Sequence, residues 1–246
     1  MTQFQRTALL IGEKGIKKLQ QSRVAVIGLG GVGSYAVEAL VRAGVGSFLI
    51  IDFDRVNESN INRQLIALHS TIGQLKTDVI KQRMLDINPQ VEIKVLSEFF
   101  AKENRLDYLN SVDFILDAID SIGPKMGMIK DLTELDIPFI SVLGAGNRLD
   151  PSKIEITSIW KTEQCPLAKR LKKLLRRYGV TKSFPVVFSS EKSLEIDLIE
   201  PVIPNDIRPD SIPKTTVGSI SYMPAIMGMM AASWLIRRIV NGEDFS

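Results

Sequence analysis

The sequence has little of the chemistry on which several enzyme classes depend. Among its 246 residues there is one cysteine, Cys165, and one histidine, His69. A single cysteine excludes an intrachain disulfide framework and a zinc site built from several cysteines. A single histidine excludes a histidine-rich metal centre and any mechanism that uses two histidines. The first residues also lack a basic stretch followed by an apolar signal core. These absences predict a reduced, cytoplasmic protein.

The rest of the composition is that of a globular protein with one local concentration of charge. The chain is 45% hydrophobic and 24% charged, which is too apolar for a disordered protein. Its net charge is +3, yet residues 160–183 hold eight lysines and arginines against one acidic residue. Such a window indicates an anionic partner, although a solvated helix face gives the same pattern. Six of these cations crowd one predicted helix: Lys169, Arg170, Lys172, Lys173, Arg176 and Arg177.

Short β-rich runs alternate with helical patterns from Arg23 onward. This alternation predicts an α/β fold with a Rossmann-like, mostly parallel sheet and helices on both faces. We assign residues 1–150 to a nucleotide-binding core and residues 151–246 to a C-terminal α+β elaboration in the same folding unit. The strands are expected at 24–27, 48–51, 91–96, 113–116 and 139–143, and the helices at 34–43, 77–87, 101–109 and 124–135.

The elaboration has a less regular pattern. We expect an edge strand over 153–160, the basic helix after Pro166, and short strands near 185–188 and 193–199. Residues 215–236 carry no charge, which approaches the length of a membrane span. A helix that begins near Pro224 would have only about half the length that a span needs. We therefore expect a buried core helix, without stable membrane insertion.

A glycine-rich segment, GLGGVG, follows the first expected strand directly. Its glycines Gly28, Gly30, Gly31 and Gly33 allow a tight turn and let backbone N–H groups approach a phosphate at a helix N-terminus. Asp52 closes the second strand, 24 positions after Gly28, where a carboxylate can accept from ribose hydroxyls. The pattern predicts a nucleotide site, but NAD-dependent dehydrogenases share it.

The segment after Asp52 is more informative. It reads DFDRVNESNINRQ, is followed by GQLKT, and supplies the cations Arg63 and Lys76. An enzyme that expels pyrophosphate needs cations around the β- and γ-phosphates, whereas a hydride carrier has no phosphate to release. From spacing alone, two surface cations without a ligand are an equally common interpretation.

Asp120 lies in the segment DAIDS, where the fourth strand ends. Because ligands bind outside the carboxyl ends of strands in an open α/β sheet, Asp120 would point into the same crevice as the glycine loop. There it could hold Mg²⁺ beside a triphosphate. Taken alone, a helix N-cap formed by Asp120 or Ser121 is the favoured interpretation.

In this order, GLGGVG, DFDRVNESNINRQ, GQLKT and DAIDS resemble the adenylation domain of the ubiquitin-activating-enzyme-like superfamily over residues 5–145. The resemblance implies that ATP adenylates a carboxylate and releases pyrophosphate. It implies the following site: Asp52 on the ribose, Asp54 and Gly31 beside the nucleotide, Asn60, Arg63 and Lys76 on phosphates, and Asp120 on Mg²⁺. The resemblance extends to Arg6, which matches an arginine that reaches the partner subunit's ATP and therefore implies a homodimer. Arg6, Arg63, Lys76 and Asp120 would be the catalytic residues.

Within that superfamily, the chain resembles nearly end to end the tRNA threonylcarbamoyladenosine dehydratases. The segments that carry the resemblance are LIGEK, AIDS with PK, GAG, DP, KT and GSISYMP. It implies ATP-dependent cyclisation of the threonylcarbamoyl group next to the anticodon, with the basic helix on tRNA phosphates of the anticodon stem-loop.

Three other functions stay open at this point. A sulfur-carrier adenylyltransferase, acting on a small ubiquitin-like protein, often carries two CxxC pairs that are absent from this sequence. An NAD-dependent oxidoreductase is disfavoured by Arg63, Lys76 and Asp120 together, and a non-catalytic binding module by the intact phosphate-contacting positions. Cys165 could be a nucleophile or a sulfur-relay residue that serves a sulfur-transfer partner. We favour a small, partly buried residue.

Overall fold

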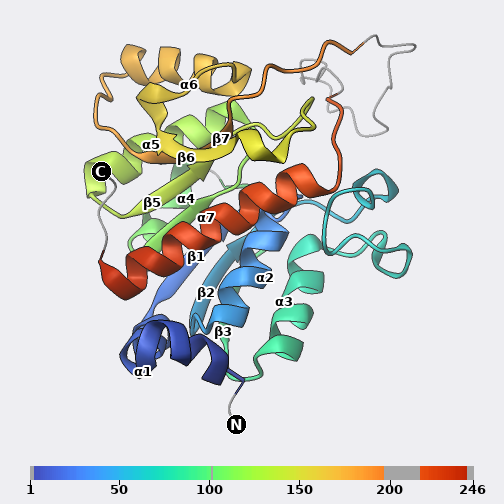
Figure 1. The fold of residues 1–246 in the computed structure, drawn as a ribbon, viewed down its shortest axis with the longest axis vertical. Helices are drawn as coiled ribbons and strands as arrows, with labels where there is room; N and C mark the ends of the chain where they lie inside the picture. Colours follow the sequence, from blue (N-terminus) through green and yellow to red (C-terminus); the bar gives the residue numbers. More distant parts are fainter. Residues whose placement is uncertain (1–2, 101, 197–216, 243–246) are drawn as a thin grey trace.

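The computed structural model describes residues 3–100, 102–196 and 217–242. The described strands form one seven-stranded sheet in the order β3-β2-β1-β4-β5-β7-β6 (Figure 1). Neighbouring strands run parallel except β6, which pairs antiparallel with β7 at the edge. The expected α/β fold with a mostly parallel sheet is confirmed.

Each strand and helix expected in the first 150 residues is observed within two residues of its expected bounds, whereas α1 was not predicted. The strands are β1 (Arg23–Ile27), β2 (Ser47–Ile51), β3 (Glu92–Leu96), β4 (Phe114–Asp117), β5 (Phe139–Val142), β6 (Ile154–Ser158) and β7 (Pro185–Ser189). The helices are α1 (Gln5–Gln21), α2 (Gly33–Ala43), α3 (Lys76–Ile87), α4 (Lys102–Leu109), α5 (Ile122–Leu135), α6 (Pro166–Arg177) and α7 (Tyr222–Asn241).

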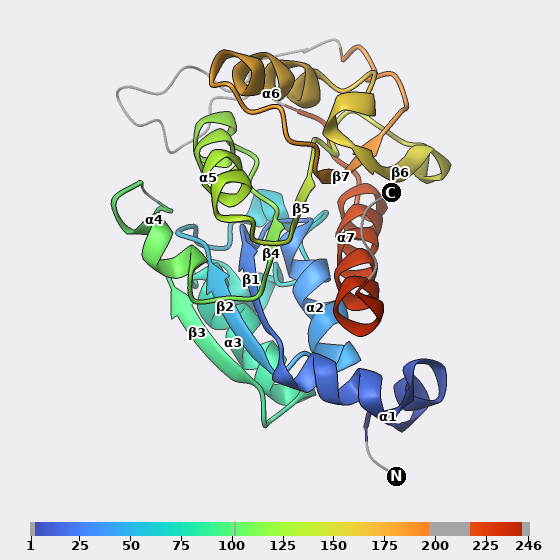
Figure 2. The same ribbon diagram turned by 90° about the vertical axis from the view of Figure 1, so that its left-hand side faces the viewer.

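The two faces of the sheet carry separate hydrophobic cores. Val24 and Val26 of β1 pack with α2, α3 and α7, whereas Ala25 and Ile27 pack with α5 and α6. All four side chains are buried, as a strand covered on both faces requires. Figure 2 shows α2 and α7 on one side of the sheet and α4 and α5 on the other.

The C-terminal part completes the sheet and adds one helix to each of its faces, α6 on one and α7 on the other. Strand β7 lies between β5 and β6. The expected edge strand over 153–160 is shorter in the structure, because 3₁₀ turns flank β6 on both sides. Residues 193–196 form no strand, and the rest of the strand expected at 193–199 lies outside the described residues. The boundary at residue 150 falls in the loop after β5 and stays a prediction.

The expected length of the C-terminal helix is wrong. Helix α7 has 20 residues, and its length and composition alone would allow it to cross a membrane. It nevertheless packs as a core helix, because Met223, Met227, Ala231 and Leu235 are fully buried. The contact with α2 is so close that a Cβ at Gly228 would lie 2.3 Å from the carbonyl oxygen of Val32.

Candidate functional site

Three loops meet at the carboxyl ends of β1, β2 and β4. Strands β1 and β4 are neighbours although β2 and β3 lie between them in the chain, so the strand order reverses here, and an open α/β sheet is expected to bind its ligand in a crevice at such a point. The loops pack tightly, because a Cβ at Gly28 (φ +91°) would lie 2.7 Å from the carbonyl oxygen of Ala118. A Cβ at Gly33 would lie 1.8 Å from that of Gly28. These glycines are therefore a steric requirement of the predicted phosphate loop at the start of α2.

Asp52 joins two of these loops. Its carboxylate accepts hydrogen bonds from the backbone N–H of Leu29 (2.6 Å) and of Asp54 (2.8 Å). Burial raises the pKa of Asp52, against the opposing effects of the nearby Lys76 charge and the two backbone donors. An ionised carboxylate has about four acceptor sites, so ribose hydroxyls can share these oxygens with the backbone.

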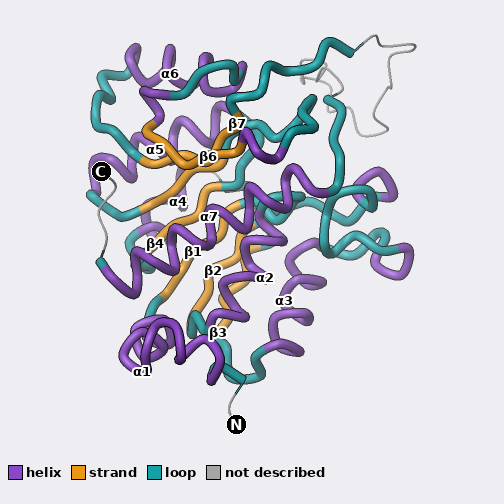
Figure 3. The backbone as a smooth tube through the Cα atoms, in the orientation of Figure 1, coloured by secondary structure: helices purple, strands orange, loops and turns teal. Residues whose placement is uncertain are grey.

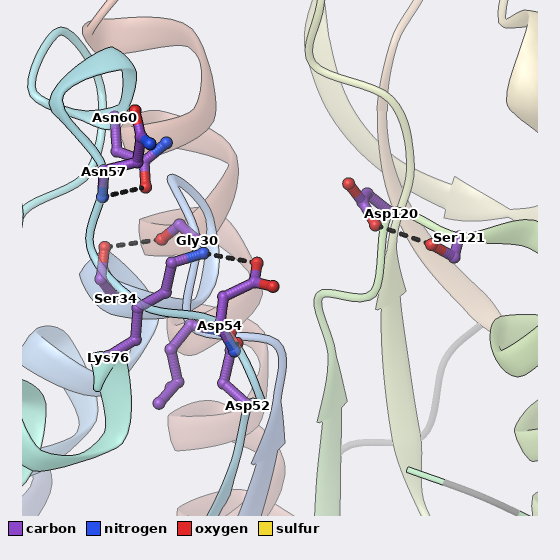
Figure 4. Close-up of polar contacts among 10 residues, drawn as sticks. Gly30, Ser34, Asp52, Asp54, Asn57, Asn60, Lys76, Asp120 and Ser121 are labelled. Carbon is purple, nitrogen blue, oxygen red and sulfur yellow. Dashed lines mark hydrogen bonds and ion pairs between the residues drawn. The ribbon is translucent and has the colours of Figure 1, made fainter. Parts of the chain in front are cut away.

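Lys76 is held by Asp54 (Figure 4). The Lys76 Nζ lies 2.8 Å from Asp54 Oδ2, and the Lys76 backbone N–H donates to the Asp54 carbonyl oxygen at 3.1 Å. Lys76 begins α3, where a cation opposes the helix dipole, and the carboxylate of Asp54 offsets that cost. The sequence showed both residues but not that they form a pair. Lys76 is 5% exposed, whereas its partner's side chain is 48% exposed toward solvent.

Arg63 and Asn60 lie in the long connection between β2 and α3, which Figure 3 shows as loop interrupted by short helical turns. The Arg63 Nη1 donates to the Ser59 carbonyl oxygen (2.7 Å) and to Asn62 Oδ1 (2.8 Å). The Asn60 side chain closes the turn by accepting from the Asn57 N–H at 3.2 Å. Burial lowers the pKa of Arg63, and the negative charge of Asp120 opposes that shift. The fold therefore brings Arg63 within electrostatic reach of Asp120.

Asp120 is exposed in the loop after β4 and accepts a hydrogen bond from the Ser121 hydroxyl at 3.0 Å. Ser121 is the N-cap residue of α5, as the alternative interpretation allowed, but its side chain makes no capping hydrogen bond there. Within the described residues no group of three or more histidine, cysteine or acidic side chains forms a metal site. Asp120 suits Mg²⁺ instead, which is commonly bound by one or two carboxylates together with substrate phosphates.

Arg6 is not brought to this crevice within one chain. It lies exposed in the first turn of α1. Helix α1 packs at the opposite end of the sheet, where the Gly46 N–H donates to the Leu19 carbonyl oxygen just before β2 begins (Figure 1). Leu9 and Leu10 of the same helix are 83% and 87% exposed.

Helix α6 displays the basic residues as expected. Leu171 and Leu175 face the core, five of the six cations are exposed, and Lys172 is half-buried with its Nζ 2.6 Å from the Thr162 carbonyl oxygen. The helix begins beside the loop after β5, because a Cβ at Gly144 would lie 3.8 Å from that of Leu167.

Cys165 is the N-cap residue of α6. Its Sγ accepts from the Ala168 N–H at 3.5 Å, and the side chain is buried. The thiol is thus occupied with capping, in agreement with the interpretation that we favoured.

Two parts of the site were missed by sequence reasoning. The segment before α7 borders the crevice, since the Ser219 carbonyl oxygen accepts from Asn62 Nδ2 (3.0 Å) and Pro224 packs where a Cβ of Gly31 would point. Its residues had entered the sequence analysis within the uncharged stretch and through the resemblance, but not as part of the nucleotide site. Gln64 is buried close to Gly30, and among the described residues its Oε1 has no hydrogen-bond partner. No sequence signal distinguished this glutamine.

Comparisons with known proteins place this geometry among related chains. The ThiF family model matches residues 4–245. A tRNA threonylcarbamoyladenosine dehydratase of Bacillus subtilis (strain 168) is 39% identical over 241 residues, which cover 97% of this chain and 95% of that protein. The crystal structure of the E. coli tRNA N6-threonylcarbamoyladenosine dehydratase in complex with ATP matches with a TM-score of 0.85 and 32% identity, over 98% of this chain and 94% of that one. A molybdopterin-synthase adenylyltransferase of Haemophilus influenzae is 28% identical over 66% of this chain and 65% of its own length.

Proposed function

The chain belongs to the ThiF family, and from this premise we propose that it is an ATP-dependent tRNA threonylcarbamoyladenosine dehydratase. The observation that carries the proposal is that Asp52, Arg63, Lys76 and Asp120 all lie beyond the carboxyl ends of β2 and β4, with Lys76 acting electrostatically on Asp52 and Asp120 on Arg63. These residues lie in a chain that matches such dehydratases over almost its whole length. A ribose acceptor, two cations and a carboxylate suit a nucleoside triphosphate that loses pyrophosphate.

The reaction activates a carboxylate and then closes a ring. A threonyl carboxylate oxygen of the modified adenosine attacks the α-phosphorus of ATP, and the bond to the β-phosphate breaks to release pyrophosphate. The neighbouring carbamoyl group attacks the resulting acyl adenylate, loses a proton and displaces AMP, which closes a five-membered ring. Overall the tRNA loses one water while ATP becomes AMP and pyrophosphate. Because the nucleophile is tethered to the electrophile, proximity supplies much of the acceleration.

Each residue of the crevice has a role in this chemistry. Asp52 accepts from the ribose hydroxyls, while Asn60, Arg63 and Lys76 contact the triphosphate. Phosphate oxygens become additional acceptors for Lys76 Nζ beside Asp54. No enzyme nucleophile is needed, which agrees with a thiol occupied in capping α6. Asp120 would hold Mg²⁺, which neutralises phosphate charge when bound.

The exposed cations of α6 are the proposed contact for the anticodon stem-loop. Phosphate contacts by lysine and arginine dominate such binding. The helix begins beside the loop that leaves β5, so its first turn lies at the end of the sheet that carries the proposed nucleotide site, whereas Arg176 lies over Trp160 farther along the helix. A cytoplasmic location and a sulfur-transfer partner stay predictions.

The assembly that fits α1 is a homodimer in which Arg6 serves the partner's crevice. Two observations support it: α1 lies at the end of the sheet opposite its own crevice, and Leu9 and Leu10 are almost fully exposed. Mixing Arg6→Ala and Lys76→Met subunits should restore activity, because one of the two crevices in a mixed dimer would be intact. A mixture as inactive as its components would contradict the exchange of Arg6.

The function is tested by AMP formation from ATP and Mg²⁺. We expect stimulation by tRNA that carries threonylcarbamoyladenosine and none by the same tRNA without the modification. Asp120→Ala should abolish turnover and leave the fold intact, and full activity of that variant would overturn its proposed role. If AMP formed with neither of the two RNAs, a small carrier protein would be favoured as the substrate.

A further inference from the structure

A cluster of three polar side chains is fully buried behind the crevice. Asp117 ends β4, Lys125 lies in α5 and Ser141 in β5, and each is 0% exposed. We call them the Asp117 cluster. Lys125 Nζ donates to Asp117 Oδ2, to Ser141 Oγ (3.1 Å) and to the Val142 carbonyl oxygen (3.0 Å), and Ser141 Oγ donates to Asp117 Oδ2 at 2.6 Å. All three protons of the ammonium group therefore have acceptors.

Stability alone does not account for this arrangement. Removing two charges from water is costly, and apolar side chains of similar volume often replace a buried ion pair without loss of stability. Apolar neighbours are already present, because Met126, Met128 and Ile129 of α5 fill the core around Lys125. The ion pair instead fixes the orientation of the Asp117 carboxylate. Because that carboxylate has fixed partners, the backbone around Asp117 is fixed as well.

The cluster holds the loop that contains Asp120 from both sides. The second oxygen of Asp117, Oδ1, accepts from the Ile119 N–H at 3.0 Å, one residue before Asp120. On the far side, the Lys125 N–H donates to the Ser121 carbonyl oxygen at 3.2 Å. The loop is thus anchored immediately before and after Asp120.

The same anchoring reaches the phosphate loop. The Ala118 N–H donates to the Ile27 carbonyl oxygen at 2.9 Å, and the Ala118 carbonyl oxygen lies 2.7 Å from the position that a Cβ of Gly28 would take. A shift of Asp117 would therefore move Asp120 and disturb the turn at Gly28 together.

We propose that Asp117, Lys125 and Ser141 are positioning residues for adenylation: they set the Asp120 carboxylate relative to the phosphate loop without touching the nucleotide. This inference rests on the proposed function, because it concerns the rate of the adenylation step. Positioning errors of about 1 Å can cost a factor of about 100 in rate. The cluster should accordingly affect kcat and the dependence on Mg²⁺ more than the binding of tRNA.

The test compares Asp117→Leu/Lys125→Met with the full-length wild-type protein in the AMP assay. The double variant leaves no buried charge unpaired, so we expect it to fold with a melting temperature near that of the wild type. We expect kcat to fall by about 10- to 100-fold, with KM for tRNA unchanged. The Mg²⁺ concentration for half-maximal rate should rise several-fold, which a merely structural role would not produce.

A second ion pair provides the matched control. Arg105 and Asp131 form a largely buried pair that joins α4 to α5 and includes no residue of the Asp117 cluster or of the loop that contains Asp120. Arg105→Met/Asp131→Leu should leave kcat and the Mg²⁺ dependence unchanged. The inference is overturned if the Asp117→Leu/Lys125→Met protein has the melting temperature, the kcat and the Mg²⁺ dependence of the wild type.

Two serine variants keep the test decisive if the double variant does not fold. Ser141 and Ser189 are both fully buried strand residues, but Ser189 Oγ accepts from the Glu191 N–H, far from the Asp117 cluster. Ser141→Ala should lower kcat several-fold while Ser189→Ala should not, and equal rates would overturn the inference. Failure of the proposed function is separate, since the wild type itself would then form no AMP with modified tRNA.

Discussion

Two lysine–aspartate pairs stand at the carboxyl ends of the sheet, and they differ in depth. Lys125 and Asp117 are both 0% exposed, and the Lys125 ammonium group has three protein acceptors. Lys76 is almost as buried, but its partner Asp54 is half-exposed and is the one acceptor of its Nζ among the described residues. A saturated ammonium group can only hold structure, whereas Lys76 can still donate to an incoming phosphate. The burial of the partner carboxylate and the number of acceptors therefore distinguish Lys125, a positioning residue, from Lys76, which can bind a ligand.

The largest expected effect is on stability, when only one partner of the more buried pair, Lys125–Asp117, is removed. Lys125→Met would leave the Asp117 carboxylate buried without its counter-charge, and such a loss costs about 3–5 kcal/mol of unfolding free energy. Urea denaturation measures it. If this variant were as stable as Asp117→Leu/Lys125→Met, charge compensation would not be what Lys125 provides.

Breaking the less buried pair, Lys76–Asp54, should have a small effect on stability and a large effect on turnover. Lys76→Met leaves Asp54 in contact with solvent, so we expect a stability change below about 1 kcal/mol. Loss of a phosphate-binding cation should lower kcat for AMP formation by about 10²–10³-fold. Denaturation and turnover measured on one preparation separate the two effects, and a stable Lys76→Met protein with wild-type kcat would show that Lys76 is structural as well.

The exposed lysines of α6 provide a third environment to compare with the two lysine–aspartate pairs. Lys169→Glu/Lys173→Glu in α6 should raise KM for modified tRNA by about tenfold and flatten its dependence on salt, with kcat unchanged. Lys81→Glu/Lys94→Glu, at exposed positions of α3 and β3, changes the net charge by the same amount and is the control. Equal effects of the two changes would argue for a general electrostatic field rather than a contact on α6.

The smallest effect concerns pH. Burial raises the pKa of Asp52, so its carboxylate becomes protonated at a higher pH than an ordinary aspartate and ATP binding should weaken on the acid side accordingly. The Lys76 charge acts against that shift. In Lys76→Met the pKa should rise further, and calorimetric titration with ATP should show the loss of affinity starting at a higher pH. Acid profiles that coincide for both proteins would exclude Asp52 as the titrating group.

The sequence predicted local features better than pairings. Strand bounds and the glycine loop follow from local patterns, since short continuous apolar runs and the turn at Gly28 depend on neighbouring residues. The partners of Lys76 and Lys125 do not, because Asp54 and Ser141 are distant in the chain and meet their lysines only once the sheet has formed. Asp117 lay just beyond the strand expected at 113–116, and its burial depends on helix α5 covering it.

The same limit applies to the C-terminal part. The uncharged stretch indicated a buried helix, yet the extent of α7 could not be predicted because Gly228 and Ser233 are poor helix formers in isolation. Tertiary packing decides instead: Gly228 permits the close approach to α2, and the long helix follows from that contact. Sequence reasoning likewise had no signal for Gln64, whose position depends on Gly30 and on the turn that begins at Asn60.

The packing of α7 on α2 has a consequence for protein synthesis. The glycine loop and α2 leave the ribosome early, whereas α7 is the last described element to emerge. Until then, the face of α2 that carries Ala36 and Leu40 has no cover, and Pro224 is not yet beside Gly31. A nascent chain therefore carries the complete nucleotide motif without a finished nucleotide site. ATP should protect the released protein against proteolysis but not a ribosome-bound chain stalled before residue 222.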